Sequence, residues 1–126
     1  MQYSMQSSRD HDAVKILVVD DEPDVLDMAS FHLADQGYRV ITAGNAAAAL
    51  QALEQNPDVA LLFTDVVMPG GIDGFELADR ARQLHPGLRI LYTSGFLKDE
   101  GVWHGSLLPK PWRLSHLDEA VRRALE

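Results

Sequence analysis

The chain has 126 residues, of which 46% are hydrophobic and 24% are charged, as is ordinary for one soluble globular domain. Its formal net charge of −8 argues against direct nucleic-acid binding, because that binding needs Lys and Arg to replace the counterions of the phosphates. The absence of cysteine excludes disulfides, zinc thiolates and cysteine nucleophiles, and without a long apolar run we expect no membrane span and a cytoplasmic protein.

The first predicted elements follow a polar start. Residues 1–13 are aperiodic, so we expect a flexible leader ahead of a single domain over residues 14–126. A β-branched apolar run at 14–19 predicts a strand, and it stops at three acids followed by Pro23, which is preorganised for a first helical turn. Gly37 ends the predicted helix. The apolar face of this helix is formed by Met28, Ala29, His32 and Leu33.

Strand and helix then alternate to the end of the chain. Further strands are predicted at 38–43, 59–64, 88–93 and 106–109. Helices are predicted between them, one capped by Asn45, one with Leu77, Ala78, Ala81 and Leu84 facing inward, and a last one opened by Ser115 with Asp118. Unbroken apolar strands that alternate with helices predict a parallel sheet covered on both faces, so we expect a doubly wound α/β domain.

Distinctive polar residues follow four of these strands at the point where each ends. Asp20 and Asp21 follow the first strand, Asp65 the third, Ser94 the fourth, and Lys110 the fifth. In open α/β sheets, ligands bind outside the carboxyl ends of the strands. The sequence therefore predicts one site at this edge of the sheet.

The residue types at this edge indicate phosphoryl chemistry. Converging carboxylates repel one another and need a cation, and oxygen-only ligands suit Mg²⁺. Lys110 can bind phosphate oxygens, and the Ser94 hydroxyl can donate to one. Together with a carboxylate nucleophile, these groups form a site for phosphoryl transfer.

Four short runs carry a family resemblance. They are LVVDDEP at 17–23, FTDVVMPG at 63–70, YTSGF at 92–96 and LPKPW at 108–112. Each run alone is common, but four in this order at predicted strand ends resemble the response-regulator receiver domains of two-component systems. The resemblance covers about residues 14–126. It implies a flavodoxin-like, three-layer sandwich with the strand order 2-1-3-4-5.

The resemblance also implies a metal site and a phosphoacceptor. By matching position, Asp65 is the residue that takes the phosphoryl group. Asp21, Asp65 and the backbone carbonyl of Val67 are the expected Mg²⁺ ligands, and Asp20 supports the metal through water.

Further roles implied by the resemblance concern the fourth and fifth strands. Ser94 is the expected switch hydroxyl because Gly95 follows it, with Thr93 as the alternative. Lys110 is expected to pair with phosphoryl oxygens, and the Lys110–Pro111 bond is expected to be cis. Trp112 is interpreted as a core anchor.

The chain departs from the family pattern in three places. The MPGGIDG loop has one residue more than usual, and its Gly70-Gly71 pair is interpreted as a flexible turn. Leu107 stands where many members carry an aromatic residue that rotates on activation. The segment between Ser94 and Lys110 is too short for a strand and a helix of about eleven residues. We therefore expect that fourth helix to be truncated or absent, and phosphorylation to order the loop over 95–105.

Three classes of function stay open at this point. The first is a receiver domain, phosphorylated by a histidine kinase or phosphotransfer protein, monomeric, and not a metabolic enzyme. The second is a Mg²⁺-dependent phosphohydrolase with an aspartate nucleophile, although such enzymes usually carry an Asp-x-Asp pair rather than the adjacent Asp20-Asp21. The third is a pseudo-receiver that acts only as an interaction module.

Overall fold

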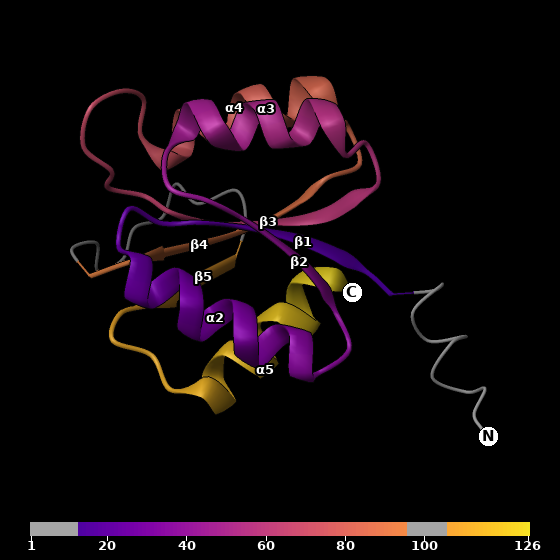
Figure 1. Ribbon diagram of the computed structural model, residues 1–126, viewed down its shortest axis with the longest axis vertical. Coiled ribbons are helices and arrows are strands. Elements are labelled where there is room, and N and C mark those ends of the chain that lie inside the picture. Colours follow the sequence, from indigo (N-terminus) through magenta and orange to yellow (C-terminus); the bar gives the residue numbers. More distant parts are fainter. Residues whose placement is uncertain (1–12, 96–105) are drawn as a thin grey trace.

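The computed structural model describes residues 13–95 and 106–126 (Figure 1). Within these ranges it contains five strands and four helices. In chain order they are β1 (Lys15–Val19), α2 (Pro23–Asp35), β2 (Arg39–Ala43), α3 (Ala46–Gln55), β3 (Val59–Asp65), α4 (Gly74–Leu84), β4 (Arg89–Ser94), β5 (Ser106–Pro109) and α5 (Leu114–Leu125). None of these four helices has the length and apolar character that crossing a bilayer requires.

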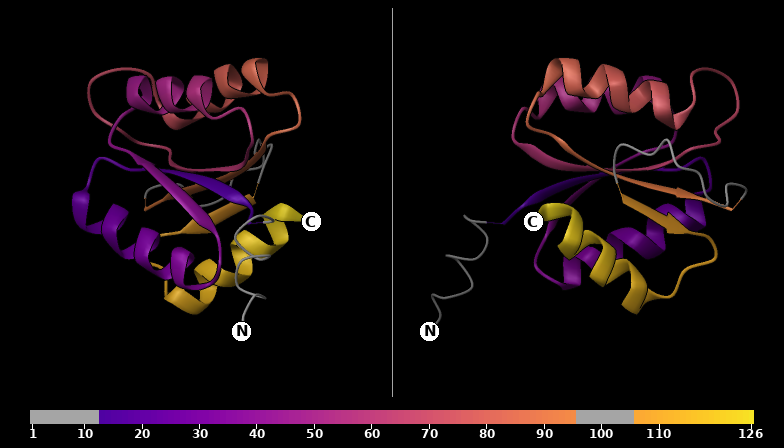
Figure 2. Two further views of the ribbon diagram at one scale, coloured as in Figure 1. Left: turned by 45° about the vertical axis from the view of Figure 1, so that its right-hand side comes forward. Right: turned by 180° about the vertical axis from the view of Figure 1, so that it is seen from behind.

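The strands form one parallel sheet in the order β2-β1-β3-β4-β5, as predicted. Helices α3 and α4 cover one face of the sheet, and α2 and α5 cover the other (Figures 1 and 2). Since every connection between parallel strands must cross a face of the sheet, this arrangement is the doubly wound, three-layer sandwich that the alternating pattern indicated.

Two hydrophobic cores lie on the two faces of the sheet. Because side chains alternate along a strand, Leu17 and Val19 of β1 join the core under α3 and α4, whereas Ile16 and Val18 join the core over α2 and α5. The central strand β3 is buried along almost its whole length. The sheet is thus held from both sides, and its carboxyl edge is left to carry polar groups.

Two predicted core positions on helices are wrong. Met28 on α2 and Leu84 at the end of α4 are 45% and 46% exposed. On α2 the buried face consists of Ala29 and Leu33, and on α4 it ends at Ala81. A helix that packs on a flat sheet buries only a narrow stripe, so apolar residues at the margin of that stripe stay in contact with solvent.

The predicted start of the last helix is also wrong. Helix α5 begins at Leu114, with Arg113 at its N-cap and no side-chain capping bond, so Ser115 lies inside the first turn. Asp118 instead accepts a hydrogen bond from His32 on α2, with 2.7 Å between Asp118 Oδ1 and His32 Nε2. Asp118 therefore joins two neighbouring helices instead of capping its own.

Several local features agree with the sequence. The Lys110–Pro111 bond is cis, and Gly70 and Gly71 both have positive φ angles, of 72° and 151°. Trp112 packs against the core over α2 and α5, and its ring lies in a tilted contact with Phe63 at a centroid distance of 6.1 Å. The predictions of a flexible leader and of a truncated helix before β5 concern residues 1–12 and 96–105, outside the described residues.

A hydrogen bond joins the end of α5 to the sheet. An Arg89 guanidinium nitrogen at the start of β4 donates to the backbone carbonyl of Ala124, at 3.2 Å. The C-terminal end of α5 therefore lies at the amino edge of the sheet, opposite the edge that carries the polar strand ends.

Candidate functional site

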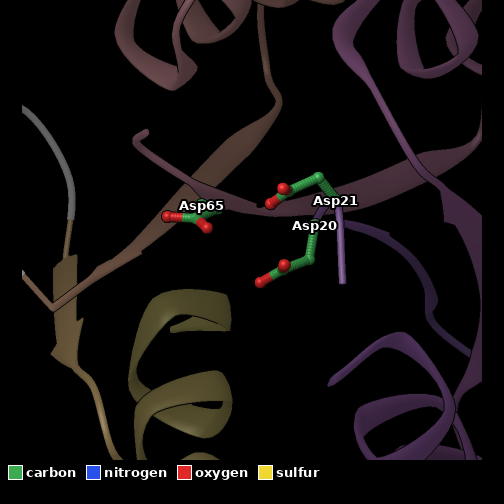
Figure 3. A group of neighbouring side chains, drawn as sticks. All are labelled: Asp20, Asp21 and Asp65. Atoms are coloured by element: carbon green, nitrogen blue, oxygen red, sulfur yellow. The ribbon is translucent and has the colours of Figure 1, made fainter. Parts of the chain in front are cut away.

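The acid cluster predicted from the sequence is present at the carboxyl edge of the sheet. Asp20 and Asp21 follow β1, and Asp65 is the last residue of neighbouring β3 (Figure 3). Each offers one carboxylate oxygen, and these oxygens all lie within 4.8 Å of one another. Asp20 and Asp65 are buried, whereas Asp21 is exposed. Three carboxylates at this separation could hold a metal ion.

Backbone amides hold two of these carboxylates in place. The amide of Glu22 donates to Asp20 Oδ1 at 2.9 Å, and the amide of Val67 donates to Asp65 Oδ1 at 3.3 Å. Both donors come two residues after the aspartate, where the chain turns out of its strand. The direction of the strand and the turn that follows it therefore fix where each carboxylate points.

Lys110 bridges the two buried carboxylates. Its Nζ atom lies 3.0 Å from Asp20 Oδ2 and 3.1 Å from Asp65 Oδ2. The sequence placed Lys110 at this edge but predicted phosphoryl oxygens as its partners. In the structure its ammonium binds the two carboxylates, because a nearby opposite charge offsets part of the cost of burying them.

The two ionised partners affect each other's protonation. Burial raises the pKa of Asp65, and the hydrogen bond and charge of Lys110 oppose only part of that rise. For Lys110, burial lowers the pKa, but the hydrogen bonds and the negative charges of Asp20 and Asp65 together outweigh burial and leave the pKa above its ordinary value. Both groups therefore hold their protons to a higher pH than a free aspartate or a free lysine does.

The two candidate hydroxyls have different surroundings. Thr93 Oγ1 donates to the backbone carbonyl of Leu108 at 2.7 Å, so this hydroxyl joins β4 to β5. Ser94 is buried at the very end of β4, and its carbonyl accepts from the amide of Lys110 at 3.0 Å. Successive side chains of a strand point to opposite faces, so Thr93 and Ser94 lie on opposite sides of β4. Ser94 as the switch hydroxyl, with Thr93 as the alternative, stays a prediction.

One residue of the site was not found from the sequence. Gly74, the first residue of α4, donates its amide to the carbonyl of Val66 at 2.8 Å. A Cβ atom there would collide with the carbonyl oxygen of Asp65 and lie 2.8 Å from Val66 Cα. Only glycine lets α4 begin directly against the backbone of Asp65. The Asp73-Gly74 pair just before a predicted helix is the sequence feature that could have indicated this close contact.

Val67 lies in the loop after β3, and its amide is the group that contacts Asp65. Its side chain is 49% exposed. That its carbonyl binds a metal stays a prediction.

Comparison with known proteins shows the family. Residues 16–122 match the family described as the response regulator receiver domain, and the chain belongs to that family. It is 32% identical over 117 residues to the response regulator receiver protein CpdR of Brucella abortus, which covers 88% of this chain and 96% of CpdR. It is 34% identical over 119 residues to the nitrogen assimilation regulatory protein NtrX of Azorhizobium caulinodans, covering 88% of this chain but only 26% of NtrX.

Solved structures agree with the sequence relatives. The receiver domain from the hybrid histidine kinase CckA is similar with a TM-score of 0.79 at 34% identity, over 89% of this chain and 99% of that one. The chemotaxis protein CheY4 of Vibrio cholerae is similar with a TM-score of 0.82 at 28% identity, over 90% and 99%.

Fold, family and relatives together define a phosphoacceptor receiver domain of two-component systems. Such a domain is a signalling unit and not a metabolic enzyme, and domains of this family work with histidine kinases and output domains. The comparisons give no support to a phosphohydrolase or a pseudo-receiver.

Proposed function

We propose that Asp65 is the phosphoacceptor of this receiver domain and that Lys110 and Ser94 handle the transferred group. The observation that carries this assignment is the place of Asp65 in the sheet. Strand β3 lies between β1, which brings Asp20 and Asp21, and β4, which brings Ser94 and leads across to β5 and Lys110. Asp65 therefore has metal-binding acids on one side and a hydroxyl and a cation on the other.

The donor atoms of the acid cluster fit Mg²⁺. Asp20, Asp21 and Asp65 offer only carboxylate oxygens, and hard divalent cations prefer such ligands. Three negative charges face the single positive charge of Lys110, so the site attracts a cation. When bound, Mg²⁺ would neutralise the acids and the charge on the phosphoryl oxygens. We propose Asp21, Asp65 and the Val67 carbonyl as direct ligands, with Asp20 acting through water.

Asp65, Lys110 and Ser94 have different roles in the proposed transfer of the phosphoryl group. A carboxylate oxygen of Asp65 forms a bond to phosphorus while the bond from phosphorus to the donor nitrogen of a phosphohistidine breaks, which leaves an acyl phosphate on Asp65. Lys110, already within 3.1 Å of Asp65, turns its ammonium to the phosphoryl oxygens. The Ser94 hydroxyl donates to one of the same oxygens.

The exposed apolar side chains of α2 and α5 fit a protein donor. Phe31 on α2 is 75% exposed, Met28 one turn earlier is 45% exposed, and Leu114 at the start of α5 is 39% exposed. The bond between His32 and Asp118 holds these two helices together. We propose that a histidine kinase or phosphotransfer protein docks against this pair of helices, that the domain remains monomeric, and that it contacts no nucleic acid directly.

Labelling with a small phosphodonor tests the assignment. Wild type, Asp65→Asn and a control, Asp58→Asn, are incubated with acetyl phosphate in Mg²⁺ or in EDTA, and the incorporated phosphate is measured by intact mass. Asp58 is an exposed carboxylate that pairs with Lys15 at the amino edge of the sheet. Wild type and the control should be labelled only in Mg²⁺, and Asp65→Asn not at all. Equal incorporation by Asp65→Asn would show that another residue accepts the group.

A further inference from the structure

Position 107 on β5 is a leucine where many receiver domains carry an aromatic residue, but the neighbouring strand β4 carries an aromatic residue beside it. Leu107 of β5 pairs in register with Tyr92 of β4, and Tyr92 is 2% exposed. The Tyr92 ring contacts the ring of Phe75, the second residue of α4, with centroids 5.0 Å apart and planes inclined by 58°. We propose that Tyr92 and Phe75 couple the phosphorylation site to α4, so that α4 moves when Asp65 is phosphorylated.

Tyr92 contacts α4 at two points. Its ring contacts the ring of Phe75, and its phenol group hydrogen-bonds with Arg82. Burial raises the pKa of Tyr92, and the charge and hydrogen bond of Arg82 oppose part of that rise. Phe75 and Arg82 are two helical turns apart on one face of α4. Tyr92 therefore contacts one residue in the first turn and one in the last turn of this helix, which runs along the sheet beside α3 (Figure 2).

Tyr92 is also linked to the phosphorylation site from the sheet side. It lies two residues before Ser94 on β4, so the two side chains point to the same face of the sheet. Next to this strand, Asp65 pairs in register with Thr93. A displacement of Ser94 toward a phosphoryl group would therefore pull on the strand segment that carries Tyr92.

Helix α4 touches the phosphoacceptor itself as well. Its first residue, Gly74, is bonded to the carbonyl of Val66 and leaves no room for a Cβ next to Asp65. The first turn of α4 thus lies against the Asp65 backbone through Gly74 and against Tyr92 through Phe75. Close-packed side chains of this kind shift together between discrete arrangements instead of yielding singly.

Hydrogen exchange of the α4 amides tests the coupling, which rests on the proposed role of Asp65. Exchange is measured in Mg²⁺ with and without beryllofluoride, an analogue of the phosphoryl group, on wild type and on Tyr92→Leu. Phe75→Leu removes the same ring contact from a half-buried position and serves if Tyr92→Leu does not fold. Ile90→Ala is the matched control, because Ile90 is buried on the same strand and face but lies one pair of residues further from the site.

In wild type and Ile90→Ala, beryllofluoride should change exchange in the first two turns of α4 by about fivefold, a typical coupling between side chains in contact. In Tyr92→Leu and Phe75→Leu this change should disappear while Asp65 is still labelled by acetyl phosphate. A labelled wild type without any change in α4, or the same change in all four proteins, overturns the inference. Absence of label on wild-type Asp65 would instead overturn the proposed function, and the inference with it.

Discussion

Removing the charge of Asp21 should stabilise the metal-free domain and abolish its stabilisation by Mg²⁺. Asp20 and Asp65 share Lys110, whereas Asp21 makes no hydrogen bond or ion pair with any other described residue. Its exposed carboxylate therefore adds only repulsion until a cation binds. Asp21→Asn keeps the size of the side chain and removes that charge.

The spacing of the cluster gives the magnitude. Its carboxylate oxygens lie within 4.8 Å of one another. At such a distance two unit charges repel by about 3.5 kcal/mol at an effective dielectric constant of about 20, and by about 0.9 kcal/mol at about 80. Because Asp21 is exposed and Lys110 offsets part of the charge of its neighbours, the lower value is the better guide. We expect a gain of about 1 kcal/mol, which raises Tm by about 4 °C in a domain of this size.

Thermal unfolding in EDTA and in Mg²⁺ measures both effects. With Mg²⁺ at about 100 times its Kd, the wild type gains about 2.7 kcal/mol, so it should become more stable than the variant. The order of the two Tm values then reverses between the two buffers. Asp27→Asn on α2 is the control, since it makes the same change in net charge at an exposed position outside the cluster.

Two results would refute this reasoning. If Mg²⁺ raises the Tm of Asp21→Asn as much as that of the wild type, the metal ligands lie elsewhere. If the metal-free variant is less stable than the wild type, Asp21 contributes a stabilising contact, and charge repulsion does not dominate the empty cluster.

Three further predictions concern neighbouring groups. Lys110→Gln should destabilise the metal-free domain by about 3 kcal/mol in urea unfolding, because two buried carboxylates lose their cation, and it should slow labelling by acetyl phosphate. Gly74→Ala should cost about 2 kcal/mol and impair labelling by displacing the Asp65 backbone, whereas Gly87→Ala, where a Cβ meets nothing within 4 Å, should do neither. The raised pKa of Asp65 means that the native state holds this proton more tightly than the unfolded state. The protonated Asp65 carboxyl therefore contributes stability below pH 3.8, and this contribution is lost as the pH rises through the native pKa. The stability of metal-free Asp65→Asn relative to the wild type should increase over that pH range. A difference that does not change with pH would contradict the assignment.

The sequence was sufficient to predict the fold and the polar residues at the carboxyl edge, but not Gly74, because the fold and the strand ends depend on local patterns. Apolar runs with intervening helical periods define a parallel doubly wound sheet, and its topology brings strand ends together. Asp20, Asp21 and Asp65 could therefore be placed at one edge before any distance was known, and the structure confirms that they converge. The same argument brought Lys110 to that edge.

Contacts between side chains distant in the sequence could not be predicted in this way. Nothing near Asp118 in the sequence indicates His32 as its partner, so the sequence pattern predicted only that Asp118 helps to cap its own helix. Lys110 and Asp20 are 90 positions apart, and no local pattern indicates that they pair. The contact between Tyr92 and Phe75 depends on how α4 lies across β4, which neither local periodicity nor composition specifies.

The bond from Arg89 to Ala124 has a consequence for how such a domain is joined to other proteins. It brings the end of α5 to the amino edge of the sheet, where β1 also starts at Lys15. A covalent neighbour that follows α5 would emerge there, on the side away from Asp65. In NtrX the matched region is 26% of the length, so the greater part of that regulator lies outside the region that this chain matches.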